Sequence, residues 1–101
     1  MVNRVEQSKA LASEARVAIL DWLRTPKDHF SHQVTGDPQE IGVCVTLITE
    51  KLGMAQPTVS RHLDLLRRAG FVTVDRIGRW AFFKRDEAGV TDYKAWLRDH
   101  L

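Results

Sequence analysis

The chain has 101 residues, a formal net charge of +2 and one cysteine, Cys44. Its length suits one domain over residues 1–101, with a core small enough to gain from dimerisation. A single cysteine excludes an internal disulfide, and the sequence has neither a membrane-length apolar stretch nor an apolar N-terminal segment, so we expect a cytoplasmic protein with no membrane contact.

The first 40 residues predict two helices followed by a loop. Apolar residues recur at helical spacing through residues 5–23. Ser13 is a suitable N-cap, so the pattern predicts a short helix that ends near Ala12 and a second helix over residues 14–23. Residues 26–40 are rich in Pro, Gly, Asp and His, which is typical of a long loop.

The next segment predicts a short strand, residues 42–45, and two helices joined by a tight turn. Thr46 would cap the first helix, which runs to residue 52, and Gly53 would close it in the left-handed conformation. Pro57 suits the first turn of the second helix because its missing N–H costs nothing there. Two helices joined by a short turn that contains Gly form a helix-turn-helix, whose second helix can lie in the major groove of DNA.

A β-hairpin is expected directly after this second helix. Residues 71–77 and 80–85 are rich in β-branched and aromatic types, and Gly78-Arg79 suits a type II′ turn between them. A hairpin in this position is a wing. The expected fold is therefore mainly α with a small β-hairpin: a winged helix-turn-helix with about five helices and a two-stranded wing.

The last helix is expected to begin after a loop at residues 86–90, with Thr91 as its cap. Four of its apolar residues lie nearly on one side, and on a monomer they would form an exposed patch. A second copy of the chain could cover this patch, or the helix could fold back on its own core. The residues that we assign to a dimer interface, with complements from the first helix, are Val5, Leu11, Tyr93, Trp96, Leu97 and Leu101.

The faces of the second helix of the helix-turn-helix differ in character. Its apolar residues recur at positions that place them on one stripe, which we expect to be buried. The other face carries the residue types that match base edges, with Arg suited to guanine, Gln to adenine and the Thr methyl group to thymine. Gln56, Thr58 and Arg61 are the candidates for base contacts, and Ser60 and His62 the candidates for phosphate contacts. The full set of expected DNA contacts, including the wing, is Gln56, Pro57, Thr58, Ser60, Arg61, His62, Arg67, Arg76, Arg79 and Arg85.

Positive charge is concentrated on this part of the chain. Residues 56–85 contain seven Lys or Arg and two Asp, a local charge of +5 that leaves −3 for the remainder. Such a distribution suits a partner with a phosphate backbone, although basic residues also simply solvate protein surfaces. A winged helix can bind proteins instead of nucleic acid, so a protein-interaction module stays open. An enzyme is not expected, because the chain has no phosphate-binding Gly-rich loop, no nucleophile elbow and no His-Glu-x-x-His motif.

With these residues identified, the chain resembles the ArsR/SmtB family of winged-helix bacterial regulators. The resemblance rests on the run from Gln56 to Leu63, the helix exit from Leu66 to Val72, the wing tripeptide Gly78-Arg79-Trp80 and the segment 11–20. It implies a homodimer built through the first and last helices, which binds a palindromic site in double-stranded DNA. Many members of this family repress and release DNA when an effector binds. A regulator that takes its signal from a co-regulator protein stays open as a separate alternative.

The chain departs from metal-sensing members of this family. They often carry Cys-x-Cys before the turn, whereas here Gly42 takes the first position and only Cys44 remains. A lone thiolate is a poor start for a soft-metal site, so we expect neither a metal site nor a cofactor. The alternative is a metal- or redox-sensing repressor that uses Cys44 and the loop histidines. The side chains considered for such a loop site are Asp28, His29, His32, Asp37 and Glu40.

Overall fold

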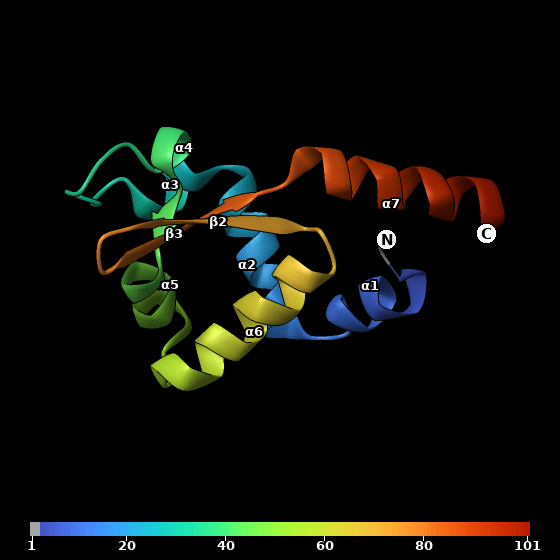
Figure 1. Ribbon diagram of the computed structural model, residues 1–101, viewed down its shortest axis with the longest axis horizontal. Coiled ribbons are helices and arrows are strands. Elements are labelled where there is room, and N and C mark those ends of the chain that lie inside the picture. The colour runs from blue at the N-terminus through green and yellow to red at the C-terminus, as the bar shows by residue number, and fades with distance from the viewer. Residues whose placement is uncertain (1–2) are drawn as a thin grey trace.

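The computed structural model describes residues 3–101, in which seven helices and three strands form one body of 42 × 26 × 24 Å (Figure 1). In chain order the elements are α1 (Arg4–Ala10), α2 (Glu14–Arg24), α3 (Pro26–Phe30), α4 (Pro38–Ile41), β1 (Val43–Cys44), α5 (Val45–Leu52), α6 (Gln56–Arg68), β2 (Val72–Ile77), β3 (Trp80–Arg85) and α7 (Glu87–His100). Helices α1 and α7 lie at one end of the molecule, and the β2–β3 turn lies at the other. The winged helix-turn-helix expected from the sequence is confirmed.

The core forms where α6 packs against α2 and α5. The predicted stripe of α6 is buried, because Val59, Leu63, Leu66 and Ala69 each expose at most 1% of their surface. Ile19 of α2 and Ile48 of α5 are fully buried against the same cluster. Burial of this stripe sets the rotation of α6, so that its opposite face points to solvent.

The sheet contains one strand more than the predicted two-stranded wing. Its order is β1-β3-β2, and β1 pairs antiparallel with β3 so that Val43 lies opposite Phe83. The predicted strand at residues 42–45 therefore exists as β1 and joins the base of the hairpin. Gly78 at the hairpin turn has φ 59°, and no non-glycine residue within residues 3–101 has a positive φ. Positive φ at the first central position alone is what a type II′ turn requires.

The predicted loop at residues 26–40 contains two short helices, which explains why the helices number seven rather than about five. Each begins with a proline, Pro26 in α3 and Pro38 in α4. The Asp37 carboxylate accepts the backbone N–H of Gln39 and caps α4. Phe30 is fully buried and anchors α3 to the core. Tertiary burial of this ring stabilises a helix too short to be stable alone.

Two predicted caps are wrong. Helix α5 begins at Val45, two residues earlier than a cap at Thr46 implies, because β1 runs directly into it and Cys44 occupies the N-cap position. Helix α7 begins at Glu87, and the Asp86 carboxylate accepts the N–H of Gly89 in place of a cap at Thr91. The predicted loop at residues 86–90 is therefore the first turn of the last helix.

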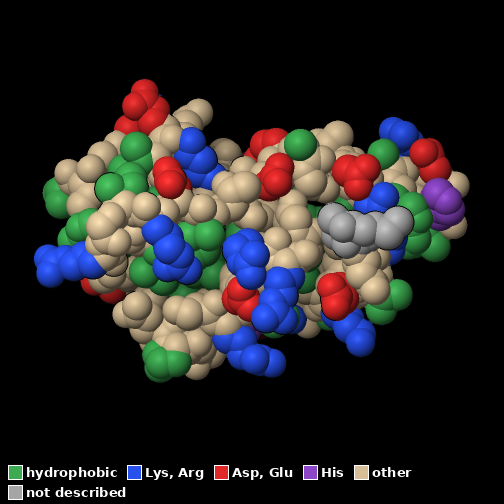
Figure 2. Space-filling model, viewed as in Figure 1, with side chains coloured by type: hydrophobic (Ala, Val, Ile, Leu, Met, Phe, Trp, Pro, Cys, Tyr) green, Lys and Arg blue, Asp and Glu red, His purple; other side chains and the backbone are tan. Residues whose placement is uncertain are grey.

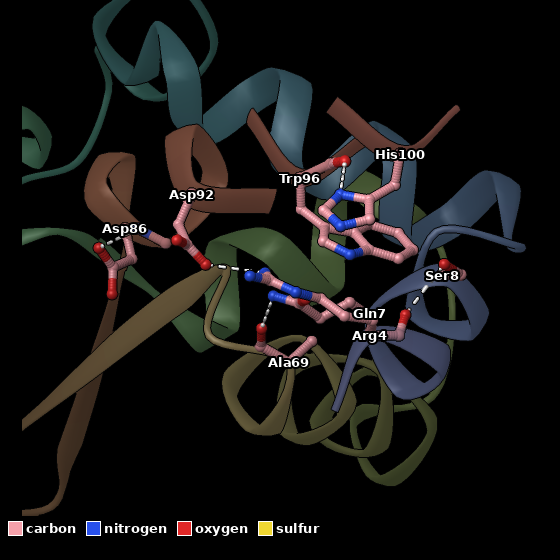
Figure 3. Close-up of polar contacts among 9 residues, drawn as sticks. Arg4, Gln7, Ser8, Ala69, Asp86, Asp92, Trp96 and His100 are labelled. Carbon is pink, nitrogen blue, oxygen red and sulfur yellow. Dashed lines mark hydrogen bonds and ion pairs between the residues drawn. The ribbon is translucent and has the colours of Figure 1, made fainter. Parts of the chain in front are cut away.

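Helix α7 packs on its own chain in its first half. Tyr93 is buried, its ring meets Phe71 edge-on at 5.3 Å between centroids, and its hydroxyl lies 2.8 Å from that of Ser8 in α1. Arg4 of α1 pairs with Asp92 at 2.7 Å and lies over the Trp96 ring, as Figure 3 shows. Tyr93 is therefore part of the core of its own chain, and the expectation that it lies in the dimer interface is corrected.

The far half of α7 and the outer side of α1 remain open. Leu101 exposes 95% of its surface and Val5 exposes 62%, while Trp96 and Leu97 are half-buried. Among the described residues, no helix is long and apolar enough to cross a membrane.

Candidate nucleic-acid interface

Helices α5 and α6 form the helix-turn-helix, and Gly53 makes the turn between them possible. Gly53 adopts φ 66° and ψ 28°, the left-handed conformation expected for it, and its N–H donates to the carbonyls of Thr49 and Glu50. Pro57 lies in the first turn of α6, as predicted. The residues of α6 that face solvent include Gln56, Pro57, Thr58, Ser60 and Arg61. The side chains expected to contact bases are therefore all exposed and lie on the first turns of this helix.

A groove of about 210 Å³ lies between α6 and the hairpin. One wall of the groove is formed by α6, and the other is formed by residues near the hairpin turn. The polar residues that line it are Gln56, Ser60, Asp64, Arg67, Arg76 and Arg79. Figure 2 shows Lys and Arg side chains gathered over α6 and along the hairpin on the same face. Five residues that the sequence assigned to DNA contact are thus brought to one concave surface.

Asp64 lies within this basic surface and binds two of its arginines. Its carboxylate accepts from Arg67 at 2.8 Å and pairs with Arg68 at 3.0 Å. The hydrogen bond from Arg67 lowers the pKa of the Asp64 carboxyl, and the charge of Arg68 acts in the same direction. Asp64 is therefore ionised at neutral pH and neutralises part of the basic face. The sequence could have predicted these two ion pairs, because Arg67 and Arg68 follow Asp64 by three and four residues on one helix.

Arg61 and the hairpin arginines are placed differently. Arg61 is exposed and makes no ion pair within residues 3–101. Arg79 lies in the turn at the tip of the hairpin, and its guanidinium is 5.2 Å from the centroid of the Trp80 ring. A cation held over an aromatic ring at an exposed site keeps its charge available to an anion.

Two of the predicted contacts bind other parts of the chain, Arg85 fully and His62 through one ring nitrogen. Arg85 turns inward, where it donates to the carbonyl of Leu20 in α2 at 3.2 Å and pairs with Glu87, and its side chain is only 11% exposed. The expectation that Arg85 contacts DNA is therefore corrected, since this guanidinium fixes β3 to α2. His62 is half-buried on the flank of α6, and its Nδ1 lies 3.0 Å from Arg16 of α2.

The residues considered for sensing do not converge. His29 packs beside Trp22 and Phe30, His32 is exposed, and Cys44 is buried in β1. Across residues 3–101, no three His, Cys, Asp or Glu side chains lie close enough together to hold a metal ion.

The architecture and this basic concave face define the chain as a winged helix-turn-helix DNA-binding domain. The family of bacterial regulatory proteins described as the arsR family matches residues 43–74. The chain is 41% identical over 97 residues to YbzH of Bacillus subtilis, an uncharacterized HTH-type transcriptional regulator. The aligned region covers 96% of this chain and 97% of that protein. It is 34% identical over 79 residues to the HTH-type transcriptional repressor SmtB of Mycobacterium tuberculosis. Here the aligned region covers 78% of this chain and 47% of that protein.

Solved structures agree with this assignment at the level of the fold. A crystal structure of an ArsR family transcriptional regulator superposes with a TM-score of 0.71 at 21% identity, over 96% of this chain and 91% of that one. The homodimeric winged helix-turn-helix DNA-binding domain of a possible ArsR-family regulator from Mycobacterium bovis superposes with a TM-score of 0.63 at 25% identity, over 96% and 80%. The chain belongs to the arsR family of bacterial transcriptional regulators. Its family and fold are those of DNA-binding regulators and not of enzymes.

Proposed function

We propose that this protein is a homodimeric repressor that binds a palindromic promoter site through α6 and the β2–β3 hairpin, without a metal site of its own. The observation that supports this most directly is the groove between α6 and the hairpin. It combines residues suited to base edges with arginines suited to phosphates on one concave face.

In this proposal the first turns of α6 enter the major groove. Gln56, Thr58 and Arg61 contact base edges, because their side chains are exposed and their chemistry matches adenine, thymine and guanine. The phosphate contacts come from the flanks of α6 and from the hairpin. They are assigned to Ser60, His62, Arg67, Arg76 and Arg79. Most of the affinity then arises from phosphate neutralisation and falls steeply with salt.

The dimer is proposed to form at the end of the molecule where α1 and α7 lie. Val5 and Leu101 are exposed there, and Trp96 and Leu97 are half-buried beside them. The related domain from Mycobacterium bovis is homodimeric. To bind the two halves of a palindrome, the dimer must place its two copies of α6 in successive major grooves, about 34 Å apart.

Control of DNA binding is proposed to come from an effector or a co-regulator protein instead of a metal ion. Cys44 is buried, and the loop histidines point to separate surroundings. The alternative, a metal- or redox-sensing repressor, would need these groups to rearrange before they could share a ligand.

Fluorescence anisotropy tests the proposal. The purified protein is titrated against its own upstream region and a scrambled fragment at several salt concentrations, with and without zinc or nickel. We expect tighter binding to the native fragment, a strong salt dependence and no effect of metal. Equal affinity for both fragments would contradict sequence-specific binding at this site, and a metal-dependent change would contradict metal independence.

A further inference from the structure

Arg16 of α2 connects the end of α1 to the middle of the recognition helix α6. Its Nε donates to the carbonyl oxygen of Ala10 at 2.7 Å, and its Nη2 donates to that of Lys9 at 3.3 Å. Its Nη1 lies 3.0 Å from Nδ1 of His62. The side chain is half-buried, and its three nitrogens therefore bind two separate elements at once.

The chemistry of this contact determines where the His62 ring carries its proton. A guanidinium has only donors, so Nδ1 of His62 must accept the hydrogen bond and carry no proton. The neutral ring then has its proton on Nε2, because the bond made by one ring nitrogen sets the state of the other. Partial burial lowers the pKa of His62, and the charges of Arg16 and Arg61 lower it further, so the ring is neutral at pH 7.

The position of His62 on α6 places its ring on the same face of the helix as a residue expected to contact DNA. His62 follows Thr58 by four residues, and residues four apart on a helix lie on the same face. Thr58 is exposed in the first turns of α6. Nδ1 points to Arg16, and Nε2 is at the other edge of a ring that keeps part of its surface in solvent.

We propose that Arg16 is a positioning residue for DNA binding, which holds His62 as its Nε2–H tautomer so that the recognition helix presents a hydrogen-bond donor to a DNA phosphate. The proposal rests on the proposed function. It adds that a residue outside the helix-turn-helix fixes the ring nitrogen from which His62 donates to DNA. Without Arg16 the free ring would populate both tautomers, and only one of them donates from Nε2.

A second contact shows that α1 and α6 are joined firmly enough for this role. Gln7 of α1 is only 1% exposed, and its Nε2 donates to the carbonyl of Ala69 at 2.9 Å, just after α6 (Figure 3). Its Oε1 accepts from Arg4 at 3.1 Å. Helix α1, whose carbonyls bind Arg16, is therefore also fixed to the end of α6 through Gln7. This second contact limits how far Arg16 and His62 can separate.

Nitrogen NMR of the histidine rings tests the tautomer in the absence of DNA. In the wild-type protein at pH 7.5 we expect His62 to show a protonated Nε2 and an unprotonated Nδ1. Arg16→Met should convert this pattern to a mixture of tautomers. Arg24→Met is the matched control, because it removes the same charge from the same helix and Arg24 pairs only with Asp21 within the described residues. A proton on Nδ1 in the wild type, or an unchanged ring in folded Arg16→Met, would overturn the proposal.

Two His62 variants separate the two edges of the ring. His62→Asn keeps an acceptor for Arg16 where Nδ1 was but has no group at the Nε2 position, whereas His62→Gln can place an N–H near the Nε2 position. We expect His62→Asn to bind both the native fragment and scrambled DNA about five- to thirty-fold more weakly, because each protomer loses one phosphate bond. His62→Gln should retain more of the affinity. The comparison stands even if Arg16→Met does not fold.

The outcomes distinguish this proposal from the proposed function. If the wild type shows no preference for its upstream region, sequence-specific binding fails, while the NMR result still decides the tautomer. If the wild type is specific and His62→Asn binds both fragments as tightly as the wild type does, His62 donates nothing to DNA and the role of Arg16 is refuted.

Discussion

Arg61 and Asp64 lie one helical turn apart on the exposed side of α6, yet we expect opposite effects from their removal. Arg61 makes no ion pair within residues 3–101 and is available to a ligand, whereas Asp64 holds Arg67 and Arg68. A free arginine can bind guanine with two hydrogen bonds, and a carboxylate on the same face repels the phosphate backbone.

We expect Arg61→Ala to weaken binding to the native site by about 1–3 kcal/mol and to relax the preference at one base pair. The measurement is anisotropy against a set of single-base variants of the site. If affinity falls equally for the native site and for random DNA, Arg61 contacts phosphate and the assignment to a base is wrong.

Asp64→Asn should increase affinity for any DNA, most strongly at low salt, because it releases Arg67 and Arg68 to bind phosphates. The ratio of specific to nonspecific binding should then fall, and the salt dependence should become steeper. Asp75→Asn is the control, since it removes the same charge from an exposed position in the hairpin. Equal effects of the two substitutions would show that net charge, and not release of the arginines, is responsible.

Protonation of His62 should reduce stability in mildly acidic solution. Its folded-state pKa is lowered from 6.5, so between these two values the unfolded chain binds more protons than the folded one. The free energy of unfolding therefore falls as the pH drops below about 6.5. Urea unfolding at pH 7.5 and 5.5 should show a smaller decline for His62→Asn than for the wild type, and parallel declines would contradict this.

At the scale of elements, the chain just after α6 and the first turn of α7 approach each other closely. The backbone N–H of Asp86 donates to the carbonyl of Phe71 at 2.9 Å, and Asp86 caps α7. Gly89 lies in the first turn of that helix, where a Cβ would collide with the carbonyl oxygen of Gly70. The two chain segments approach so closely there that only a glycine fits.

Gly89→Ala should therefore destabilise the protein by about 1–3 kcal/mol, although alanine normally favours a helix over glycine. Thermal and urea unfolding measure the effect. Ala88→Ser is the control, since Ala88 is exposed in the same turn and the change should be nearly neutral. A more stable Gly89→Ala variant would show that the backbone at this junction can move apart.

At the scale of the whole molecule, exposed apolar side chains occur on more than one part of the surface. Val5 and Leu101 are exposed beside α1 and α7, far from the hairpin turn (Figure 1). Val34, which exposes 96% of its surface, lies instead in the segment between α3 and α4. The proposed dimer uses only the first of these surfaces.

Val5→Glu should shift the protein toward monomers and weaken binding to a full palindrome more than to a half-site, because a charge in an apolar interface is unfavourable. Analytical ultracentrifugation measures the first effect and anisotropy the second. Val34→Glu is the matched control and should leave both unchanged. A dimeric Val5→Glu variant with wild-type affinity would place the interface elsewhere.

Local sequence patterns determined the helix-turn-helix and its wing. The apolar period of α6, the left-handed glycine at Gly53 and the turn at Gly78 each act within a few residues, so the chain alone defines them. The same reasoning identified the exposed residues of α6 and the hairpin that line one groove.

Only the tertiary structure decided how side chains with several possible partners are used. Arg85 has the residue type of a DNA contact but binds the carbonyl of Leu20, and the Nδ1 of His62 faces Arg16, so both residues depend on partners far away in the sequence. The start of α7 was missed for the same reason, because Gly89 favours a loop locally and is required in the helix by a carbonyl 19 positions earlier in the chain. Propensities describe neighbours along the chain, whereas burial, close approach and the partners of long charged side chains depend on packing between distant segments.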